Sequence, residues 1–262
     1  MAHEASDGRT RWQNWWRNCY RHSNYSMRYG GHVHDLEAEW ATAALQPVWR
    51  SGLRILSAGT GYGCVEKQVL KNLAGPRPAA MVCLDIVQPA LREFLAGCPE
   101  ARVSSSLAGV VCDASLRPFD DGPFDIVVSF GRASLGSYRR VAPEVARVTR
   151  PGGTVLFDFI SHLSPYRWIA NGGGTVRRLA GHAGLAGGTG VYPDFGPVGI
   201  RTFYQRLGLE LQKLDRVAAA PPLRHGISRE GYGRLERWCR PMGMLCDRVL
   251  LGRFVKRTVS GC

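Results

Sequence analysis

The sequence predicts an α/β protein in which helices cover both faces of a mostly parallel sheet. From residue 53 onward, short apolar runs alternate with stretches whose apolar residues recur at helical spacing, a pattern typical of such sheets. A glycine-rich turn at residues 59–63 separates the first apolar run from the first helical stretch. Of the 262 residues, 45% are hydrophobic, so the chain can bury a large core.

The first strand and the first helix of this region show the pattern most clearly. Residues 53–58 form an apolar run that ends in the glycine turn. Val65, Val69 and Leu73 then recur at helical spacing until Pro76 stops the helix. A buried strand followed by an amphipathic helix is therefore expected here.

The same reading predicts the remaining elements in order. Six further strands, which make seven in total, are expected at residues 79–86, 110–113, 124–130, 154–160, 209–217 and 247–255. Helices are expected at residues 35–48, 89–96, 201–207 and 229–239, with a shorter one at 175–183. Of these, the helix at 89–96 is opened by a proline and closed by a glycine.

We expect two domains. Residues 1–52 precede the sheet, are rich in tryptophan and tyrosine, and are predicted to form an N-terminal helical cap. Residues 53–262 are predicted to form the sheet domain. Within it, residues 161–199 interrupt the alternation with many glycines, which predicts a flexible insertion or lid over a site.

Charge is distributed unevenly along the chain. The formal net charge is +13, of which residues 161–262 carry +10, whereas residues 1–52 carry +1 and residues 53–160 carry +2. A basic face is the electrostatic footprint of polyanion binding but does not show readout. Nucleic acid is therefore the second choice of partner.

The cysteines and the apolar runs indicate whether the chain could bind a metal ion, span a membrane or be secreted. The eight cysteines include no C-x-x-C pair, so no metal site is expected. There is no run of eighteen apolar residues, and residues 1–10 lack the apolar stretch of a secretory signal. We expect no membrane span and a cytoplasmic location.

The glycine turn points to a ligand. A turn between a strand and a helix lets backbone N–H groups approach a bound molecule at the helix N-terminus. Cys64 stands where a dinucleotide fingerprint would have its third Gly or Ala, so a single nucleoside fits better. Asp85 closes the second expected strand, where it could accept ribose hydroxyls, and Asp113 closes the third. Each could instead be a helix cap or a solvated turn residue.

These features, taken in order along the chain, resemble the motifs of class I S-adenosylmethionine (SAM)-dependent methyltransferases. The matching segments are residues 53–63 (LRILSAGTGYG), 82–86 (VCLDI), 112–119 (CDASLRPF), 124–129 (FDIVVS) and 144–154 (EVARVTRPGGT). The resemblance covers about residues 53–160 and implies a Rossmann-like fold with seven strands.

The resemblance also implies SAM as the cofactor and assigns roles to residues at the ends of the first four strands. Glycines shape the turn under the methionine part, one aspartate holds the ribose, and the other reads the adenine together with a backbone amide. The implied cofactor-binding residues are Gly59, Thr60, Gly61, Gly63, Asp85, Ile86, Asp113, Ala114 and Ser129. Ser57 departs from the pattern, because the family usually has an acid there that helps to hold the turn and the amino group of the cofactor.

Methyl transfer from a sulfonium needs alignment and exclusion of water more than it needs a base. For a hydroxyl acceptor, His162, just past the fifth expected strand, is the candidate base, although it could be an ordinary loop residue. The candidate substrate-binding residues are Tyr25, Tyr29, His32 and Arg132.

The acceptor is expected to be a small metabolite, with specialised metabolites included, that is methylated at oxygen or nitrogen. Residues 129–132 (SFGR) are not the Asn/Asp-Pro-Pro-Tyr signature associated with exocyclic amines of bases, and no RNA-binding module is apparent. An RNA methyltransferase that uses the basic C-terminal half is the alternative. A protein that keeps the pocket without methylating is a third hypothesis, and a homodimer stays open.

Overall fold

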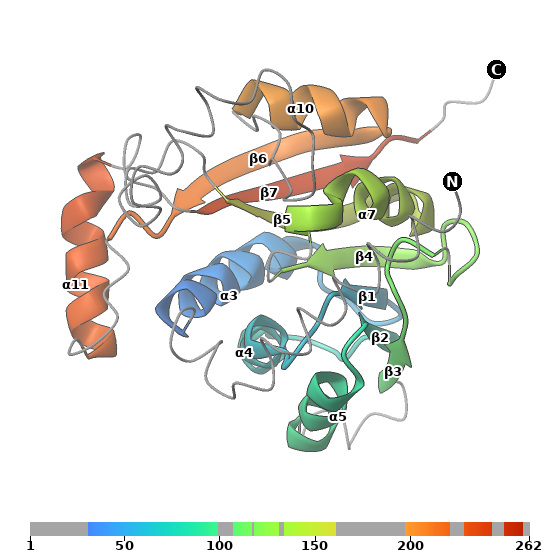
Figure 1. Ribbon diagram of the computed structural model, residues 1–262, viewed down its shortest axis with the longest axis horizontal. Coiled ribbons are helices and arrows are strands. Elements are labelled where there is room, and N and C mark those ends of the chain that lie inside the picture. The colour runs from blue at the N-terminus through green and yellow to red at the C-terminus, as the bar shows by residue number, and fades with distance from the viewer. Residues whose placement is uncertain are drawn as a thin grey trace, which may run out of the picture.

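The computed structural model describes residues 31–98, 107–116, 118–130, 134–160, 197–220, 228–242 and 249–258. These residues contain a seven-stranded sheet in the order β3-β2-β1-β4-β5-β7-β6 (Figure 1). The strands are β1 (Arg54–Ala58), β2 (Ala80–Asp85), β3 (Leu107–Val111), β4 (Phe124–Ser129), β5 (Thr149–Ile160), β6 (Leu209–Val217) and β7 (Val249–Lys256). β1 to β5 pair in parallel, and β7 runs antiparallel to both of its neighbours. The predicted fold class is thereby confirmed.

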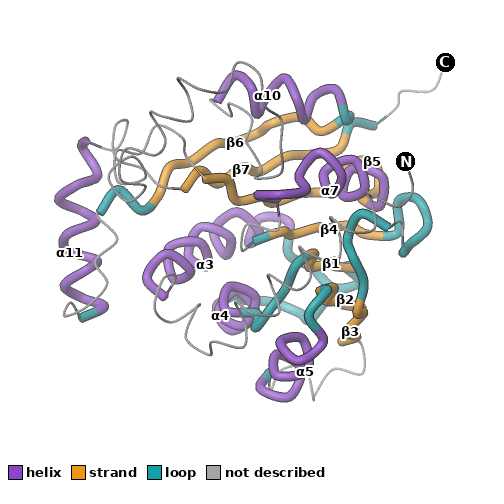
Figure 2. The backbone as a smooth tube through the Cα atoms, in the orientation of Figure 1, coloured by secondary structure: helices purple, strands orange, loops and turns teal. Residues whose placement is uncertain are grey.

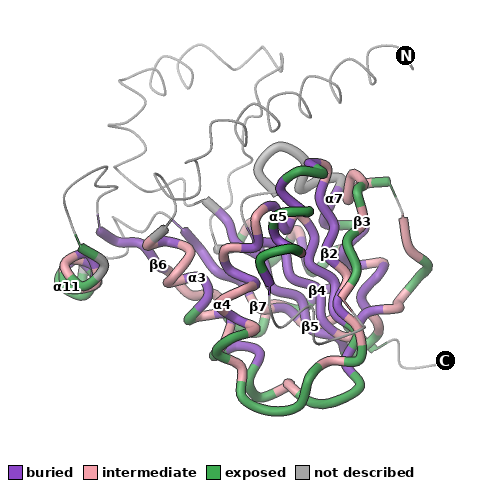
Figure 3. Tube along the Cα trace, turned by 90° about the horizontal axis from the view of Figure 1, so that it is seen from below, coloured by how far each residue is buried: buried purple, intermediate pink, exposed green. Residues whose placement is uncertain are grey.

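Helices cover both faces of this sheet, which gives three layers (Figures 1 and 2). One core joins the sheet to α3 (Gly31–Leu45), α4 (Cys64–Asn72) and α5 (Gln88–Gly97). The other core joins it to α7 (Ser134–Val148) and α10 (Pro197–Arg206). Figure 3 shows the buried residues gathered along the strands, because each central strand packs against helices on two sides.

α3 confirms the helix expected before the sheet, with shifted bounds. It begins at Gly31 and ends at Leu45, because Pro47 opens a short 3-10 turn, Gln46–Val48, that cannot continue the α-helix. Its small residues let it lie close to the sheet: Ala38 and Ala41 are fully buried in the core that also contains Ile55. Trp40 Nε1 donates to Asp215 Oδ2 of β6 at 2.5 Å, which ties the helix to the far part of the sheet.

Three details differ from the expectations. α7 was not expected; Pro143 lies inside it, and Val141, Val145 and Val148 supply its buried face. β5 starts at Thr149 rather than 154, with a register shift against β4 between residues 124 and 126. β3 ends at residue 111 rather than 113, because Asp113 turns the chain through its hydrogen bonds to Ser115.

The carboxyl ends of β1 to β6 meet at one edge, where α11 (Arg229–Cys239) also lies (Figure 1). Val249 of β7 pairs with both Ile160 and Val217, so β5 and β6 end at the same edge, on either side of β7. Ala219 and Ala220, just past β6, donate their backbone N–H groups to Glu236 of α11 at 3.0 and 2.8 Å. α11 is thus anchored beside this edge. The short turn Arg240–Met242 follows it.

Candidate active site

The turn after β1 is built from left-handed backbone. Gly59, Gly61 and Gly63 have φ angles of +79°, +55° and +63°, values that other residues rarely adopt. The Gly59 and Thr60 N–H groups both donate to the Leu84 carbonyl at the end of β2, at 2.8 and 3.1 Å. A Cβ on Gly63 would lie 2.0 Å from the Phe94 ring, so this position also needs glycine for space. The turn therefore presents bare backbone at the start of α4.

Asp85 ends β2 directly beside this turn. Its Oδ2 accepts the Gly61 N–H at 2.7 Å, and its Oδ1 accepts the Val87 N–H at 2.8 Å. The side chain is buried, and burial raises its pKa, although the backbone hydrogen bonds oppose that shift. Asp85 therefore braces the glycine turn, and its carboxylate keeps acceptor capacity for a ligand hydroxyl.

Asp113 and Ala114 follow β3 at the same edge. The Cys112 N–H donates to the Asp85 carbonyl at 3.1 Å, which sets these residues beside the end of β2. Asp113 Oδ1 accepts from both the backbone N–H and the hydroxyl of Ser115, at 2.9 and 2.7 Å. The side chain thus caps a turn, as one of the two sequence interpretations expected, and its second oxygen is available to a ligand.

Ser129 ends β4 at the point where strand order reverses between β1 and β4. It is fully buried, and its hydroxyl has no hydrogen-bond partner within the described part of the chain. A buried hydroxyl without a partner is costly, and strand ends at such a switch point are where α/β sheets bind ligands. Together with the bare glycine turn, this orphaned hydroxyl fits a nucleoside cofactor at the carboxyl edge.

Beneath the turn lies a group of buried polar side chains that includes Glu66, which the sequence did not mark as a site residue. Ser57 Oγ donates to Glu66 Oε1 of α4 at 2.7 Å, and the Thr60 hydroxyl lies 2.9 Å from Ser57 Oγ. Burial raises the pKa of Glu66 to about 7, although hydrogen bonds from Ser57 and its own backbone lower it. The available signal was an acid three residues after Gly63, in the first turn of a helix.

α3 adds two more titratable groups to this site. Glu37 is fully buried; one of its oxygens lies 2.9 Å from His34 Nδ1, and the other has no partner among the described residues. The charges of both residues act on Glu66: His34 lowers its pKa and Glu37 raises it.

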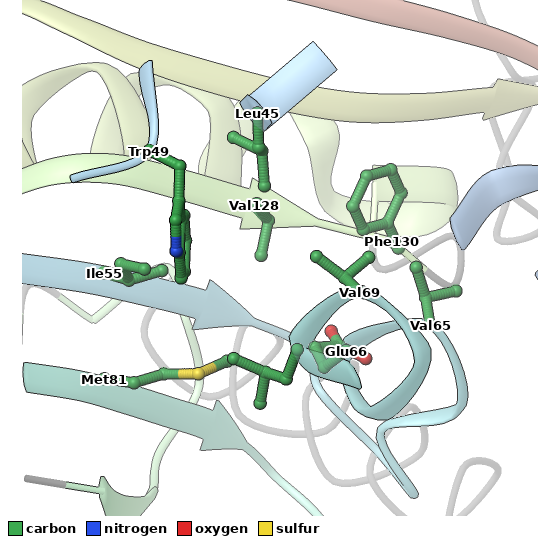
Figure 4. Close-up of a pocket in the computed structure, with 10 residues that line it drawn as sticks. Leu45, Trp49, Ile55, Val65, Glu66, Val69, Met81, Val128 and Phe130 are labelled. Carbon is green, nitrogen blue, oxygen red and sulfur yellow. The ribbon is translucent and has the colours of Figure 1, made fainter. Parts of the chain in front are cut away.

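Glu66 also lines a small cavity between α4 and the sheet (Figure 4). Its volume is about 20 Å³, and Figure 4 shows Trp49 and Ile55 on the side opposite Glu66. The remaining lining side chains are apolar, apart from the Trp49 ring nitrogen. A space of this size holds about one water molecule, so it is a packing defect rather than the nucleoside site.

Of the residues expected to contact the acceptor or to act as a base, only His32 lies within the described part of the chain. His162, Tyr25, Tyr29 and Arg132 lie outside the described residues, and the expected lid at 161–199 lies outside them up to residue 196. His32 is described: it opens α3 and stacks on Tyr232 of α11, with ring centroids 4.5 Å apart and planes at 9°. One face of its ring is therefore occupied by a contact between helices.

Neither a metal-binding cluster nor a membrane-spanning helix occurs among the described residues. They contain no group of three or more His, Cys, Asp or Glu side chains placed to hold a metal ion. None of the described helices is both long enough and apolar enough to cross a membrane.

The sheet order and the glycine turn beside Asp85 define a Rossmann-like α/β protein with its candidate site at the carboxyl edge. Residues 55–153 match the protein family described as "Methyltransferase domain". The match covers 99 of the 262 residues, and the fold of the chain is similar to that of solved methyltransferases.

One curated relative and two solved structures illustrate the similarity. Demethylmenaquinone methyltransferase of Mycolicibacterium gilvum (strain PYR-GCK) is 42% identical over 65 residues, which are 24% of this chain and 28% of that protein. The chain thus spans under a third of that relative.

Both structures share the fold over nearly the whole chain. The Haloferax volcanii methyltransferase solved with its Trm112 activator has a TM-score of 0.60 at 18% identity, and the alignment covers 95% of this chain and 97% of that one. The 1,6-didemethyltoxoflavin-N1-methyltransferase of Burkholderia thailandensis, solved with its substrate and S-adenosylhomocysteine, has a TM-score of 0.58 at 13% identity. That alignment covers 98% of this chain and 91% of the other.

Proposed function

We propose that this protein is a SAM-dependent methyltransferase that methylates an oxygen or nitrogen atom of a small metabolite. The observation that carries the proposal is the left-handed glycine turn braced by Asp85 at the carboxyl edge of the sheet. Both features lie within the segment that matches the methyltransferase family.

The cofactor would be held by the ends of the first four strands. The turn at Gly59, Gly61 and Gly63 lets the methionine part approach the backbone, because no Cβ intervenes. The Asp85 carboxylate would accept hydrogen bonds from the ribose hydroxyls. Asp113 and the Ala114 amide would contact the adenine ring, and Ile86 and Thr60 would line the same slot.

Bound SAM would supply a methyl group on a sulfonium, which the acceptor atom attacks in line. The protein's own part is then to fix the two reacting atoms in line and to exclude water. Ser129 contributes a buried hydroxyl at the switch point. His162 stays the candidate base for a hydroxyl acceptor, whereas His34 is engaged by Glu37.

A small acceptor is supported by the relatives. The relative from Mycolicibacterium gilvum is named for a quinone, and the Burkholderia thailandensis enzyme was solved with 1,6-didemethyltoxoflavin bound. Tyr25, Tyr29, His32 and Arg132 are our candidates for contacting the acceptor. A cytoplasmic location and a homodimer stay predictions from the sequence.

The test is transfer of a labelled methyl group. The protein is incubated with a cell extract and isotopically labelled SAM, and mass spectrometry is used to find a product heavier by the labelled methyl. We expect one small product, which Gly63→Ala abolishes and Gly52→Ala preserves, because Gly52 has a left-handed backbone with nothing near its missing Cβ. Binding of S-adenosylhomocysteine without any labelled product would favour the non-methylating hypothesis instead.

An RNA acceptor is the second candidate, and one surface favours it. Arg234, Arg237 and Arg240 are exposed along and just after α11, and Trp238 between them is 73% exposed. Basic and aromatic side chains together can bind a nucleic-acid backbone and stack on bases. This candidate predicts retention on RNA that weakens steeply with salt, whereas the metabolite enzyme should show no retention at physiological salt.

A further inference from the structure

The turn after β1 lacks a carboxylate of its own, and the structure places one beside it from another element. Ser57 is fully buried, at the position where the methyltransferase motif that this segment resembles usually has an acid. Its hydroxyl donates to Glu66, which α4 brings to within 2.7 Å. Glu66 is itself buried, so this contact is not a solvent-exposed pair that salt would screen.

The hydrogen bonds connect Glu66 to the binding turn itself. The Thr60 hydroxyl can donate to Ser57 Oγ at 2.9 Å or to the Ser57 carbonyl at 3.1 Å. Thr60 in turn accepts the Gly63 N–H through its carbonyl at 2.8 Å. A continuous path therefore runs from the Glu66 carboxyl through two hydroxyls to the glycines of the turn.

α3 shares a core with α4 and brings two titratable groups near Glu66. Glu37 and His34 are close enough for their charges to act on it, and one Glu37 oxygen is buried without a partner among the described residues. Glu37 and Glu66 are both buried, and two adjacent buried carboxylates repel each other. This arrangement is stabilised when the two carboxyls share a proton or when a positive charge lies nearby.

We propose that Glu66 is a positioning residue that replaces the missing acid at Ser57 and holds the cofactor-binding turn through Ser57 and Thr60. The identity of the ligand in this inference rests on the proposed function, whereas the role of Glu66 in holding the turn does not. In this chain the acid comes from the helix, nine residues further along the chain than Ser57.

The first experiment measures S-adenosylhomocysteine affinity by calorimetry. Glu66→Leu removes the acceptor at similar size, and we expect it to raise Kd about tenfold, since one hydrogen bond to a charged or polar group carries about that factor. Glu66→Gln keeps the acceptor and should stay within about threefold of the unaltered protein. Glu39→Leu, at an exposed acid of α3, is the matched control and should change nothing. Equal effects of Glu66→Leu and Glu66→Gln would overturn the proposal.

The second experiment restores the acid to the strand. Ser57→Asp alone should weaken binding, because it sets two buried carboxyls against each other. Adding Glu66→Gln should recover most of the lost affinity, because the pair again contains one acid. If Ser57→Asp binds as well as the unaltered protein and Glu66→Gln adds nothing, Glu66 does not substitute for the acid.

The third experiment needs no ligand, and so separates this inference from the proposed function. The N–H groups of Gly59, Thr60, Gly61 and Gly63 are all hydrogen-bonded in the structure. Glu66→Leu should speed their hydrogen exchange by about tenfold, and Glu66→Gln should not. Unchanged exchange in Glu66→Leu would overturn the positioning role, whereas failure of the unaltered protein to bind the nucleoside would overturn only the proposed function.

Discussion

Gly63 and Gly52 have similar left-handed backbones and opposite surroundings. Gly63 has φ +63° and faces the Phe94 ring, whereas Gly52 has φ +79° with nothing within 4 Å of a Cβ. The two positions therefore separate two effects of a single methyl group, which are backbone strain and overlap with a packed ring.

Gly63→Ala should lower the free energy of unfolding by about 3 kcal/mol, the sum of strain and overpacking. Gly52→Ala should lower it by only about 1 kcal/mol, because strain acts alone there. Urea unfolding of both variants measures the difference. Equal losses would mean that Phe94 moves aside without cost.

Glu66 makes the stability of the protein depend on pH. Its pKa rises from 4.5 to about 7 on folding, mainly because burial disfavours the charged form. Between these values the unfolded chain releases the proton while the folded protein keeps it. Stability from this group is therefore full below about pH 4.5 and is lost as the pH rises through about 7.

The expected loss is about 3 kcal/mol of unfolding free energy between pH 4.5 and pH 8. Glu66→Gln removes the titrating group. Between the two pH values, the unfolding free energy of this variant should therefore fall by about 3 kcal/mol less than that of the unaltered protein. Urea unfolding of both proteins at the two pH values tests this. Asp85, whose pKa is also raised, is present in both proteins and cancels from the comparison. Parallel pH profiles would contradict the buried position of Glu66.

At the level of elements, α11 is attached mainly through the Glu236 side chain. Glu236 is buried and accepts two backbone N–H groups just past β6, beside Ala218, which has a left-handed φ of +62°. Tyr232 stacks on His32 of α3 from the same helix. The backbone N–H groups that orient α11 at the carboxyl edge therefore lie 16 and 17 positions before Glu236. The stacking of Tyr232 on His32 joins the same helix to the N-terminal part of α3.

Glu236→Ala should lower the unfolding free energy by about 2–3 kcal/mol, because it leaves two buried N–H groups without an acceptor. Hydrogen exchange should rise in residues 228–239 before it rises in the central strands. Glu230→Ala, at an exposed acid on the same helix, should cost under about 0.5 kcal/mol. Similar losses from the two substitutions would show that Glu236 does not anchor the helix.

At the level of the whole molecule, the site is assembled by the sheet. The turn after β1, Asp85 and Ser129 come from three strands that lie side by side, and Asp113 follows the strand at the edge. A ligand that contacts several strand ends stabilises the folded state only, so its binding should appear in the thermal unfolding of the entire domain.

S-adenosylhomocysteine at one hundred times its Kd should stabilise the fold by about 2.7 kcal/mol, which raises Tm by roughly 5–10 °C for a chain of this length. NAD at the same concentration is the control and should give no shift, because Cys64 interrupts the dinucleotide fingerprint. Differential scanning calorimetry measures both. A larger shift with NAD would reassign the site to a dinucleotide.

Much of the fold could be predicted because its signals are local. Apolar periodicity defined all seven strands within a few residues, and the glycine turn with Asp85 and Asp113 marked the carboxyl edge. α7 was missed because a proline and a glycine within it hide the spacing of Val141 and Val145. The ends of β3 and β5 were displaced because side-chain hydrogen bonds and a register shift, rather than apolar runs, determine them.

The sequence by itself determined the succession of strands and helices along the chain and the residue types at the cofactor turn. These features depend on neighbours a few positions away. Only the tertiary structure decided that β7 lies antiparallel between β5 and β6, that Glu236 anchors α11, and that Glu66 meets Ser57 under the turn. Those contacts depend on burial and on pairing between distant elements. The pKa of a carboxyl and the partner of a hydroxyl are properties of the packed interior, which no single segment of the chain contains.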